Sequence, residues 1–294
     1  MKKRLAIAMM GLLMLGLWTA REANVAGIDW LGRVSALGGA EGESWRRKEG
    51  ALGGDAGPVG LFEGMGVIPI TPMFGLQMNG GVGGRDSFRM HFQGGPIVDF
   101  GMGKAGVFWG TQVRKYAASS LEDGVEGRAN RIAWSNWARV ATAFYLPGMN
   151  IDLWYSQPFG GANRFPVNAA DHAGKRIVGV SEGRVAMNFF PAIIWRDNFE
   201  LTLGVHVTGL SGPDNRTRGV PMGVGPVAGM AIMPIPNLEV ALFKAQFDNR
   251  NRYRVTSGVQ WYFNRAPATL LQLRRMYLEP TNLPGTMSSD SHDL

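Results

Sequence analysis

The stretch FELTLGVHVT, residues 199–208, alternates between apolar and polar side chains. One face carries only Phe, Leu and Val, while the other carries Glu200, Thr202 and His206. This period of two predicts a β-strand whose two faces have different surroundings. A soluble β-sandwich turns its apolar face inward, whereas a membrane barrel turns that face to lipid and its polar face to a lumen. The rest of the chain must decide between these folds.

The same alternation recurs along most of the chain and predicts an all-β protein. Strands are expected near 27–38, 58–69, 72–83, 87–100, 104–116, 131–146, 150–157, 176–195, 199–210, 220–234, 238–247 and 253–263. The first two are weakly patterned, so the prediction is twelve strands with ten as the alternative. Long connections are expected at Gly39–Ala56, Ala117–Asn130, Pro158–Lys175 and Ser211–Gly219, alternating with short ones. This alternation of long and short connections is typical of bacterial outer-membrane barrels.

Local features refine the predicted strands. Pro191 and Pro226 indicate bulges or strand ends, because proline cannot donate a backbone hydrogen bond. Aromatic residues at Trp154–Tyr155, Trp195 and Trp261–Phe263 are predicted to form girdles where the strands meet the membrane surface.

The composition favours a membrane barrel over a soluble domain. Charged residues make up only 18%, while the chain holds 42 Gly and 9 Trp. The absence of cysteine excludes disulfides, cysteine metal sites and a cysteine-linked lipid anchor. A basic start at Lys2–Arg4 followed by the apolar run Leu5–Trp18 predicts a signal peptide, assigned to residues 1–23. No later segment is apolar enough for a membrane helix, so any crossing must use strands.

Over about residues 58–263 the chain resembles a small Gram-negative outer-membrane β-barrel. The stretch GPVAGMAIMPIPNLEVALFKAQFDNRNRYRVTSGVQWYF, residues 225–263, is similar to the closing strands of the transporter barrels of the MetA-pathway (phenol degradation) group. The similarity lies in a Gly-Pro opening, a Pro-Asn turn, an Asn-Arg loop and an aromatic finish. It implies a barrel over residues 24–264 in the outer membrane. The even number of twelve strands brings both termini to the periplasm.

The C-terminal segment departs from this resemblance. Such barrels end on a C-terminal aromatic residue, whereas residues 264–294 follow Phe263 here. Residues 265–294 are therefore assigned to a periplasmic tail. Within it, APATLLQLRRMYLEP (266–280) places Leu270, Leu273 and Tyr277 on one face of a short predicted helix. Two alternatives stay open: the helix plugs or braces the periplasmic mouth, or the tail is loosely attached. The last fourteen residues, TNLPGTMSSDSHDL, are predicted to be disordered.

The polar faces of the predicted strands supply candidate lumen-lining residues. These are Arg89, His91, Gln93, Arg114, Arg184, Glu200, His206, Glu239 and Arg254. Two arrangements are compatible with them. In an open lumen the arginines favour the passage of anions. In a closed lumen they pair with carboxylates such as Asp99, Glu182, Glu200 and Glu239 and fill a narrow barrel.

The predicted function is that of a passive channel or transporter for small solutes, and the first alternative is a structural or anchoring barrel. No metal site or cofactor is expected, because none of the four histidines pairs with another at ligand spacing. His206-Val207-Thr208 resembles the His-x-Ser of an outer-membrane phospholipase, which makes a lipid-modifying enzyme a lesser alternative. A secreted soluble β-protein is the other.

The expected partners are outer-membrane lipid and lipopolysaccharide, small solutes and the barrel-assembly machinery. Nucleic acid is not expected, because the signal peptide holds three of the seven net positive charges. The acidic cluster Glu122, Asp123 and Glu126 is predicted to lie in a solvated loop, with a calcium or lipopolysaccharide bridge as the alternative.

Overall fold

The structure is a computed structural model that describes residues 31–46, 52–84, 88–116, 131–159, 181–195, 197–208, 223–247, 252–263 and 268–278. The predicted signal peptide, the acidic cluster at 122–126 and the tail beyond residue 278 lie outside these residues. No helix in the described part is long and apolar enough to cross a membrane.

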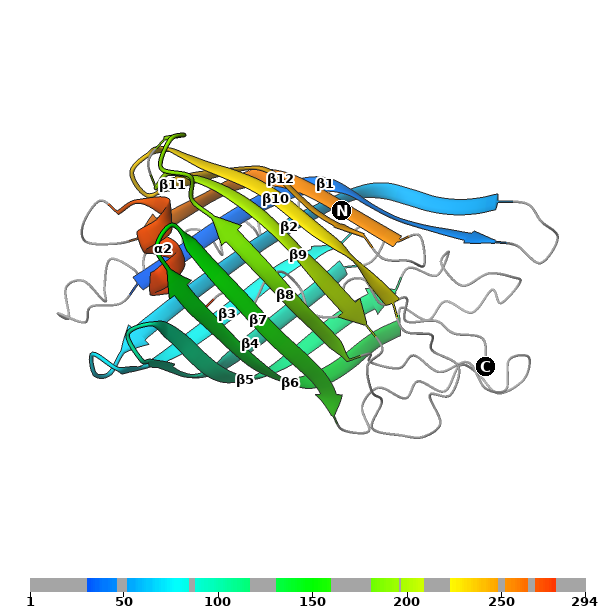
Figure 1. The fold of residues 1–294 in the computed structure, drawn as a ribbon. Helices are drawn as coiled ribbons and strands as arrows, with labels where there is room; N and C mark the ends of the chain where they lie inside the picture. The colour runs from blue at the N-terminus through cyan, green and yellow to red at the C-terminus, as the bar shows by residue number, and fades with distance from the viewer. Residues whose placement is uncertain are drawn as a thin grey trace.

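Twelve antiparallel strands form a closed barrel in which each strand pairs with its neighbours in sequence (Figure 1). They are β1 (Leu31–Arg46), β2 (Leu52–Pro69), β3 (Phe74–Gly84), β4 (Phe88–Asp99), β5 (Gly103–Tyr116), β6 (Arg131–Leu146), β7 (Met149–Phe159), β8 (Glu182–Phe189), β9 (Phe199–Thr208), β10 (Gly223–Ile235), β11 (Leu238–Phe247) and β12 (Arg252–Phe263). A short helix, α2 (Leu270–Met276), follows. The pairing of β1 with β12 closes the ring. The predicted twelve-stranded antiparallel barrel with a C-terminal helix is confirmed, and the ten-strand alternative is wrong.

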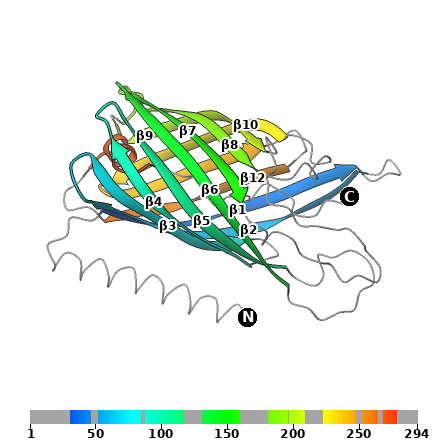
Figure 2. The same ribbon diagram turned by 90° about the horizontal axis from the view of Figure 1, so that it is seen from below.

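Two predicted boundaries need correction. The expected long connection at Gly39–Ala56 is wrong, because β1 and β2 pair continuously from Leu31 opposite Val67 to Arg46 opposite Leu52. These two strands extend beyond the others at the end away from α2 (Figures 1 and 2). The segment is rich in glycine and therefore looks like a loop, but a ladder of backbone hydrogen bonds needs no large side chains. The predicted strand 176–195 is also too long, since β8 ends at Phe189.

The predicted proline effects are local. β8 ends at Phe189, and Pro191 comes two residues later, after Phe190. Pro226 lies within β10 opposite Val205 of β9, and the pairing of β10 with β11 starts one residue later, at Val227. A register shift in that ladder follows between Met230 and Ala231. Proline therefore occupies a position where β10 has not yet begun to pair with β11, as its missing N–H requires.

The two faces of the strands differ as the alternation predicts. On β9, Leu203 and Val205 are 46% and 47% exposed, whereas Glu200, Thr202 and His206 are at most 7% exposed. Large apolar side chains are exposed around the barrel, including Met78, Met90, Phe92, Trp109, Val140, Val185, Met187, Leu242, Val259 and Trp261. A continuous apolar outside and a polar inside are the arrangement of a barrel that stands in lipid.

The ends of the barrel differ in their connections. At one end, here called the turn end, strands are joined by residues 70–73, 100–102, 147–148, 190–198 and 236–237. Gly148 and Asn237 take positive φ angles of 67° and 66° there, as tight hairpins require. The opposite end, here called the loop end, carries the connections 47–51, 85–87, 117–130, 160–181, 209–222 and 248–251. Helix α2 belongs to the turn end, where Leu271 N donates to Asp197 O.

A charge placed on the outer face of β9 tests this arrangement. Leu203→Arg is expected to cost about 2–4 kcal/mol, because the side chain would enter the hydrocarbon layer. The matched control is Gln112→Arg on β5, whose position lies opposite the buried His91 and therefore faces the interior. The check is urea unfolding in lipid vesicles, followed by the gel shift between folded and boiled protein. Equal midpoints for the two variants would contradict a lipid-facing Leu203.

Candidate functional site

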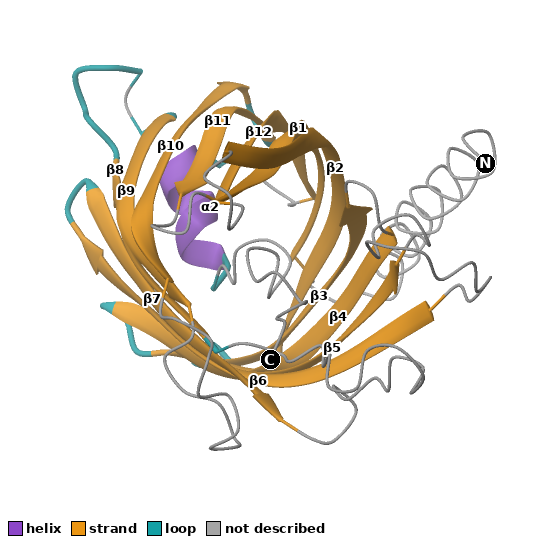
Figure 3. Cartoon of the chain, turned by 90° about the vertical axis from the view of Figure 1, so that its right-hand side faces the viewer, coloured by secondary structure: helices purple, strands orange, loops and turns teal. Residues whose placement is uncertain are grey.

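Helix α2 lies inside the ring of strands (Figure 3). Leu270, Leu273, Tyr277 and Leu278 are at most 2% exposed. They share one apolar cluster with side chains of the barrel wall, namely Met65, Val67, Ile97, Phe108, Trp137, Ala141, Ala143, Trp154, Phe190, Ala231, Met233 and Tyr262. Of the two alternatives open for the tail, these contacts support the plug, since its apolar face is packed against the inner wall.

The N-terminus of α2 is fixed by side-chain caps. Thr269 Oγ1 accepts a hydrogen bond from Gln272 N, and Gln272 Oε1 accepts one from Thr269 N, which forms a capping box. Asn198 Oδ1 accepts from Leu270 N at 3.1 Å. The turn that precedes β9 therefore positions the start of the helix, and the sequence Thr-x-x-Gln specifies where it begins.

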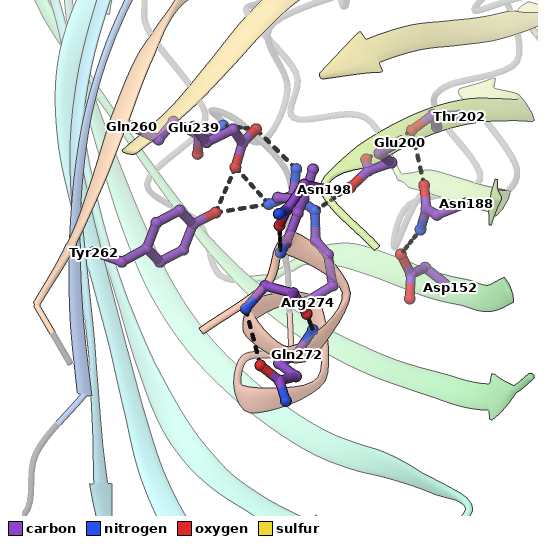
Figure 4. Close-up of polar contacts among 12 residues, drawn as sticks. Asp152, Asn188, Asn198, Glu200, Thr202, Glu239, Gln260, Tyr262, Gln272 and Arg274 are labelled. Carbon is purple, nitrogen blue, oxygen red and sulfur yellow. Dashed lines mark hydrogen bonds and ion pairs between the residues drawn. The ribbon is translucent and has the colours of Figure 1, made fainter. Parts of the chain in front are cut away.

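Arg274 forms the polar centre of the plug (Figure 4). Its Nε donates to Glu200 Oε2 at 2.5 Å, and its two terminal nitrogens donate to the Glu239 carboxylate at 2.8 Å. Tyr262 Oη accepts from Arg274 at 2.7 Å and donates to Glu239 at 2.5 Å. Arg274, Glu200 and Glu239 are 7%, 5% and 0% exposed. Such a buried cation is tolerated because two carboxylates and a hydroxyl surround it.

A polar chain extends this network along the wall. Gln260 donates to Glu239 at 2.5 Å, and Thr202 Oγ1 lies within 3.0 Å of both Glu200 and Asn188. Asn188 in turn donates to Asp152. Carboxylates from β7, β9 and β11 are thus held in place next to the helix (Figure 4).

The C-terminal end of the segment is tied to the opposite wall. Lys104 Nζ donates to Met276 O at 2.9 Å, and Tyr277 Oη donates to Gly32 O at 3.1 Å. Gln77 donates to Leu278 O at 2.5 Å and accepts from Leu278 N at 3.0 Å. Contacts on β1, β3, β5, β9, β11 and β12 therefore span the turn-end mouth.

A cation stacked between two indoles lies in the barrel wall near the plug. The guanidinium carbon of Arg139 is 4.7 Å from the ring centre of Trp137 and 4.3 Å from that of Trp154. Trp137 lies across Gly110 of β5, where an added Cβ would come within 2.2 Å of the indole. The expected role of Trp154 in an interfacial girdle is wrong, because it is 8% exposed and belongs to the interior cluster. Trp195 and Trp261 are 51% and 43% exposed, whereas the predicted girdle role of Tyr262 is wrong as well, because it is 1% exposed and belongs to the interior cluster.

A cavity of about 50 Å³ adjoins the Arg274 network. Its charged and polar lining comes from Asp152, Arg184, Asn188, Glu200, Thr202, Lys244, Gln246, Arg254, Thr256 and Arg274. A volume of this kind holds a few water molecules. The cavity beside the plug is therefore small and strongly polar.

Most of the predicted lumen residues are buried on the inner wall. His91, Gln93, Glu200, His206, Glu239 and Arg254 are at most 6% exposed, and Arg184 lines the cavity. The side chains of Arg89 and Arg114 lie outside the described residues, although their backbones pair with each other. Glu200 and Glu239 meet through Arg274, whereas Arg254 pairs with Glu41.

The functional residue that the sequence analysis missed is Arg274. Its signal is present, because it follows Leu270 by four positions and therefore shares the apolar helical face. A charge at such a position requires a buried counter-charge.

Several buried polar atoms of the inner wall have no hydrogen-bond partner within the described residues. They include Ser35 Oγ, Glu63 Oε1, His91 Nδ1, Gln93 Oε1, Arg139 Nε, His206 Nδ1, Thr208 Oγ1 and Thr256 Oγ1. They come from six different strands. Buried polar atoms of this kind are commonly satisfied by internal water.

Comparisons with known proteins agree with the barrel fold. No protein-family model matches the chain, and no curated protein matches it. Among solved structures, the COG4313 outer membrane channel from Pseudomonas putida F1 has a TM-score of 0.53 at 11% identity, covering 80% of this chain and 96% of that one. A KdgM porin has a TM-score of 0.46 at 8% identity, covering 78% and 99%. At such identities the likeness concerns the fold alone.

Removing the charge of Arg274 should release the plug. Arg274→Met leaves Glu200 and Glu239 buried without their cation, which costs about 3–5 kcal/mol. The natural chain has no cysteine, so Leu273→Cys provides a single reporter of undocking. Its labelling by a maleimide in folded protein is expected to rise about 100-fold or more when Arg274→Met is added.

The control for that experiment is Gln272→Glu, which changes an exposed side chain of the same helix and keeps the capping box. This variant should label at the rate of the parent. Slow labelling in the Arg274→Met protein would show that the ion pairs do not hold α2 in the barrel.

Proposed function

We propose that this protein is a passive outer-membrane channel for small solutes, with one mouth occupied by its own C-terminal segment. The observation that carries the proposal is the chemistry of the inner wall beyond α2. Charged and amide side chains line it, and buried donors and acceptors on several strands have no hydrogen-bond partner among the residues that the structure describes. A wall of this kind favours water in the interior, and a hydrated interior is the basis of diffusion through a barrel.

The structural-barrel alternative draws support from the narrow cavity and the Arg274 network. Both belong to the arrangement with α2 docked, in which the turn-end mouth is occupied. We infer that this arrangement is the closed state of the channel. The two functions then differ in one property, because a channel conducts once α2 has left and a structural barrel does not.

The enzymatic and soluble alternatives receive less support. His206 and Thr208 are 1% and 0% exposed on the polar face of β9, away from the apolar outside where lipid would lie. A lipid hydrolase needs its catalytic pair within reach of lipid. A soluble β-protein would bury the apolar face that includes Leu203 and Val205.

The location follows from the same proposal. We assign the apolar outside to contact with outer-membrane lipid and the loop end to lipopolysaccharide and the cell exterior. The turn end and both termini then lie in the periplasm. The signal peptide at 1–23, the barrel at 24–264 and the tail at 265–294 are part of the proposal, as are assembly by the barrel-assembly machinery and the relation to the MetA-pathway group.

Conductance tests the channel. In planar bilayers the full-length protein should conduct rarely, because α2 occupies the mouth. Deletion of residues 268–294 should produce stable open steps, and Leu273→Asp should raise the open fraction without shortening the chain, because a charge then sits in the apolar cluster. Each variant is first tested for the gel shift of a folded barrel. Folded variants that never conduct would leave the structural barrel as the better account.

Accessibility on intact cells tests the orientation. An epitope inserted in 117–130 or 209–222 should bind antibody on intact cells. The same epitope at the 236–237 turn should bind only after the outer membrane has been opened. The reverse pattern would invert the proposed orientation.

A further inference from the structure

We propose that the cavity beside α2 is a binding site for a small oxyanion, a carboxylate or phosphate group, centred on Lys244 and Thr256. This inference names the solute class of the proposed channel and rests on that function. It starts from the wall formed by β11 and β12. Lys244 lies directly opposite Thr256 in that ladder, and Gln246 lies directly opposite Arg254. Residues that face each other in an antiparallel pair share one side of the sheet, and all four line the cavity.

The neighbouring strand leaves space beside the lysine. Lys244 pairs on its other side with Gly229 of β10, which in turn pairs with Thr202 of β9. Because Gly229 has no side chain, nothing projects from the wall between Lys244 and Thr202 at this level. The ammonium group therefore has an open neighbour position in the cavity.

Lys244 and Thr256 both carry unused hydrogen-bond donors. Thr256 is 1% exposed, and its Oγ1 has no hydrogen-bond partner within the described part of the chain. Lys244 is half-buried and makes no hydrogen bond or ion pair with any described residue. Two other cations of the cavity are occupied, since Arg254 pairs with Glu41 and Arg274 with Glu200 and Glu239.

The chemistry of this wall selects an oxyanion. A lysine ammonium offers three donors around a compact positive charge, and a hydroxyl and an amide stand next to it. The carboxylates of Asp152 and Glu200 line the cavity from β7 and β9, and Arg184 lines it from β8 between them. The two carboxylates disfavour an anion beside them, whereas Lys244 and Thr256 of β11 and β12 offer donors without a carboxylate in their own ladder.

Calorimetry on the purified full-length protein in detergent tests the site. The probes are succinate, inorganic phosphate and succinamide, which has the shape of succinate without its charge. Succinate or phosphate should bind and succinamide should not. Binding of succinate alone assigns a carboxylate site, and binding of phosphate alone assigns a phosphate site. A folded protein that binds neither anion, or that binds succinamide equally well, overturns the proposal.

Three substitutions locate the site. Lys244→Gln should weaken anion binding about tenfold or more, because a charged hydrogen bond is lost. Lys244→Arg keeps the charge and should retain most of the affinity, and Thr256→Val should weaken binding less than Lys244→Gln. Unchanged affinity in Lys244→Gln overturns the assignment. The channel itself is tested separately, by the conductance of the protein truncated at residue 267. If the truncated protein conducts and the full-length protein binds no anion, only this inference is refuted.

Discussion

Closure of the ring by the pairing of β1 with β12 is the constraint on which the rest of the structure depends. In a closed barrel every strand has two hydrogen-bonded neighbours, so no edge is left in a medium that cannot solvate it. Closure also gives each strand one face toward the outside and one toward a shared interior. The composition of those two faces then decides what the barrel can hold.

The outer face was predictable from the sequence because its surroundings are uniform. Lipid requires the same kind of side chain at every second position, so Leu203, Val205 and Trp261 follow one rule, and the strand number follows from counting such segments. The prediction failed between Gly39 and Ala56, where glycine weakens the pattern while the backbone pairing continues. It also failed for Trp154, whose position in an aromatic-rich segment did not reveal which face it occupies.

The inner face was predictable only where it is polar. Away from α2, His91, Gln93 and His206 illustrate inward polar positions. Near the turn end, Val67, Ile97 and Phe108 are buried in one cluster with α2. When both faces of a strand are apolar, the sequence does not indicate which element covers the inner face. Only the position of the helix, more than two hundred residues away from Val67 in sequence, explains them.

Arg274 lies where these two parts of the interior meet, and its chemistry differs from that of the leucines beside it. The leucines favour docking through the removal of apolar surface from water, which needs no particular partner. The arginine requires Glu200 and Glu239 in one geometry, because an ion pair with a misplaced partner does not repay its desolvation. Apolar contacts thus supply attraction between α2 and the wall, while the ion pairs specify a single docked position. A plug held in this way has one docked position, and the polar cavity adjoins its ion pairs.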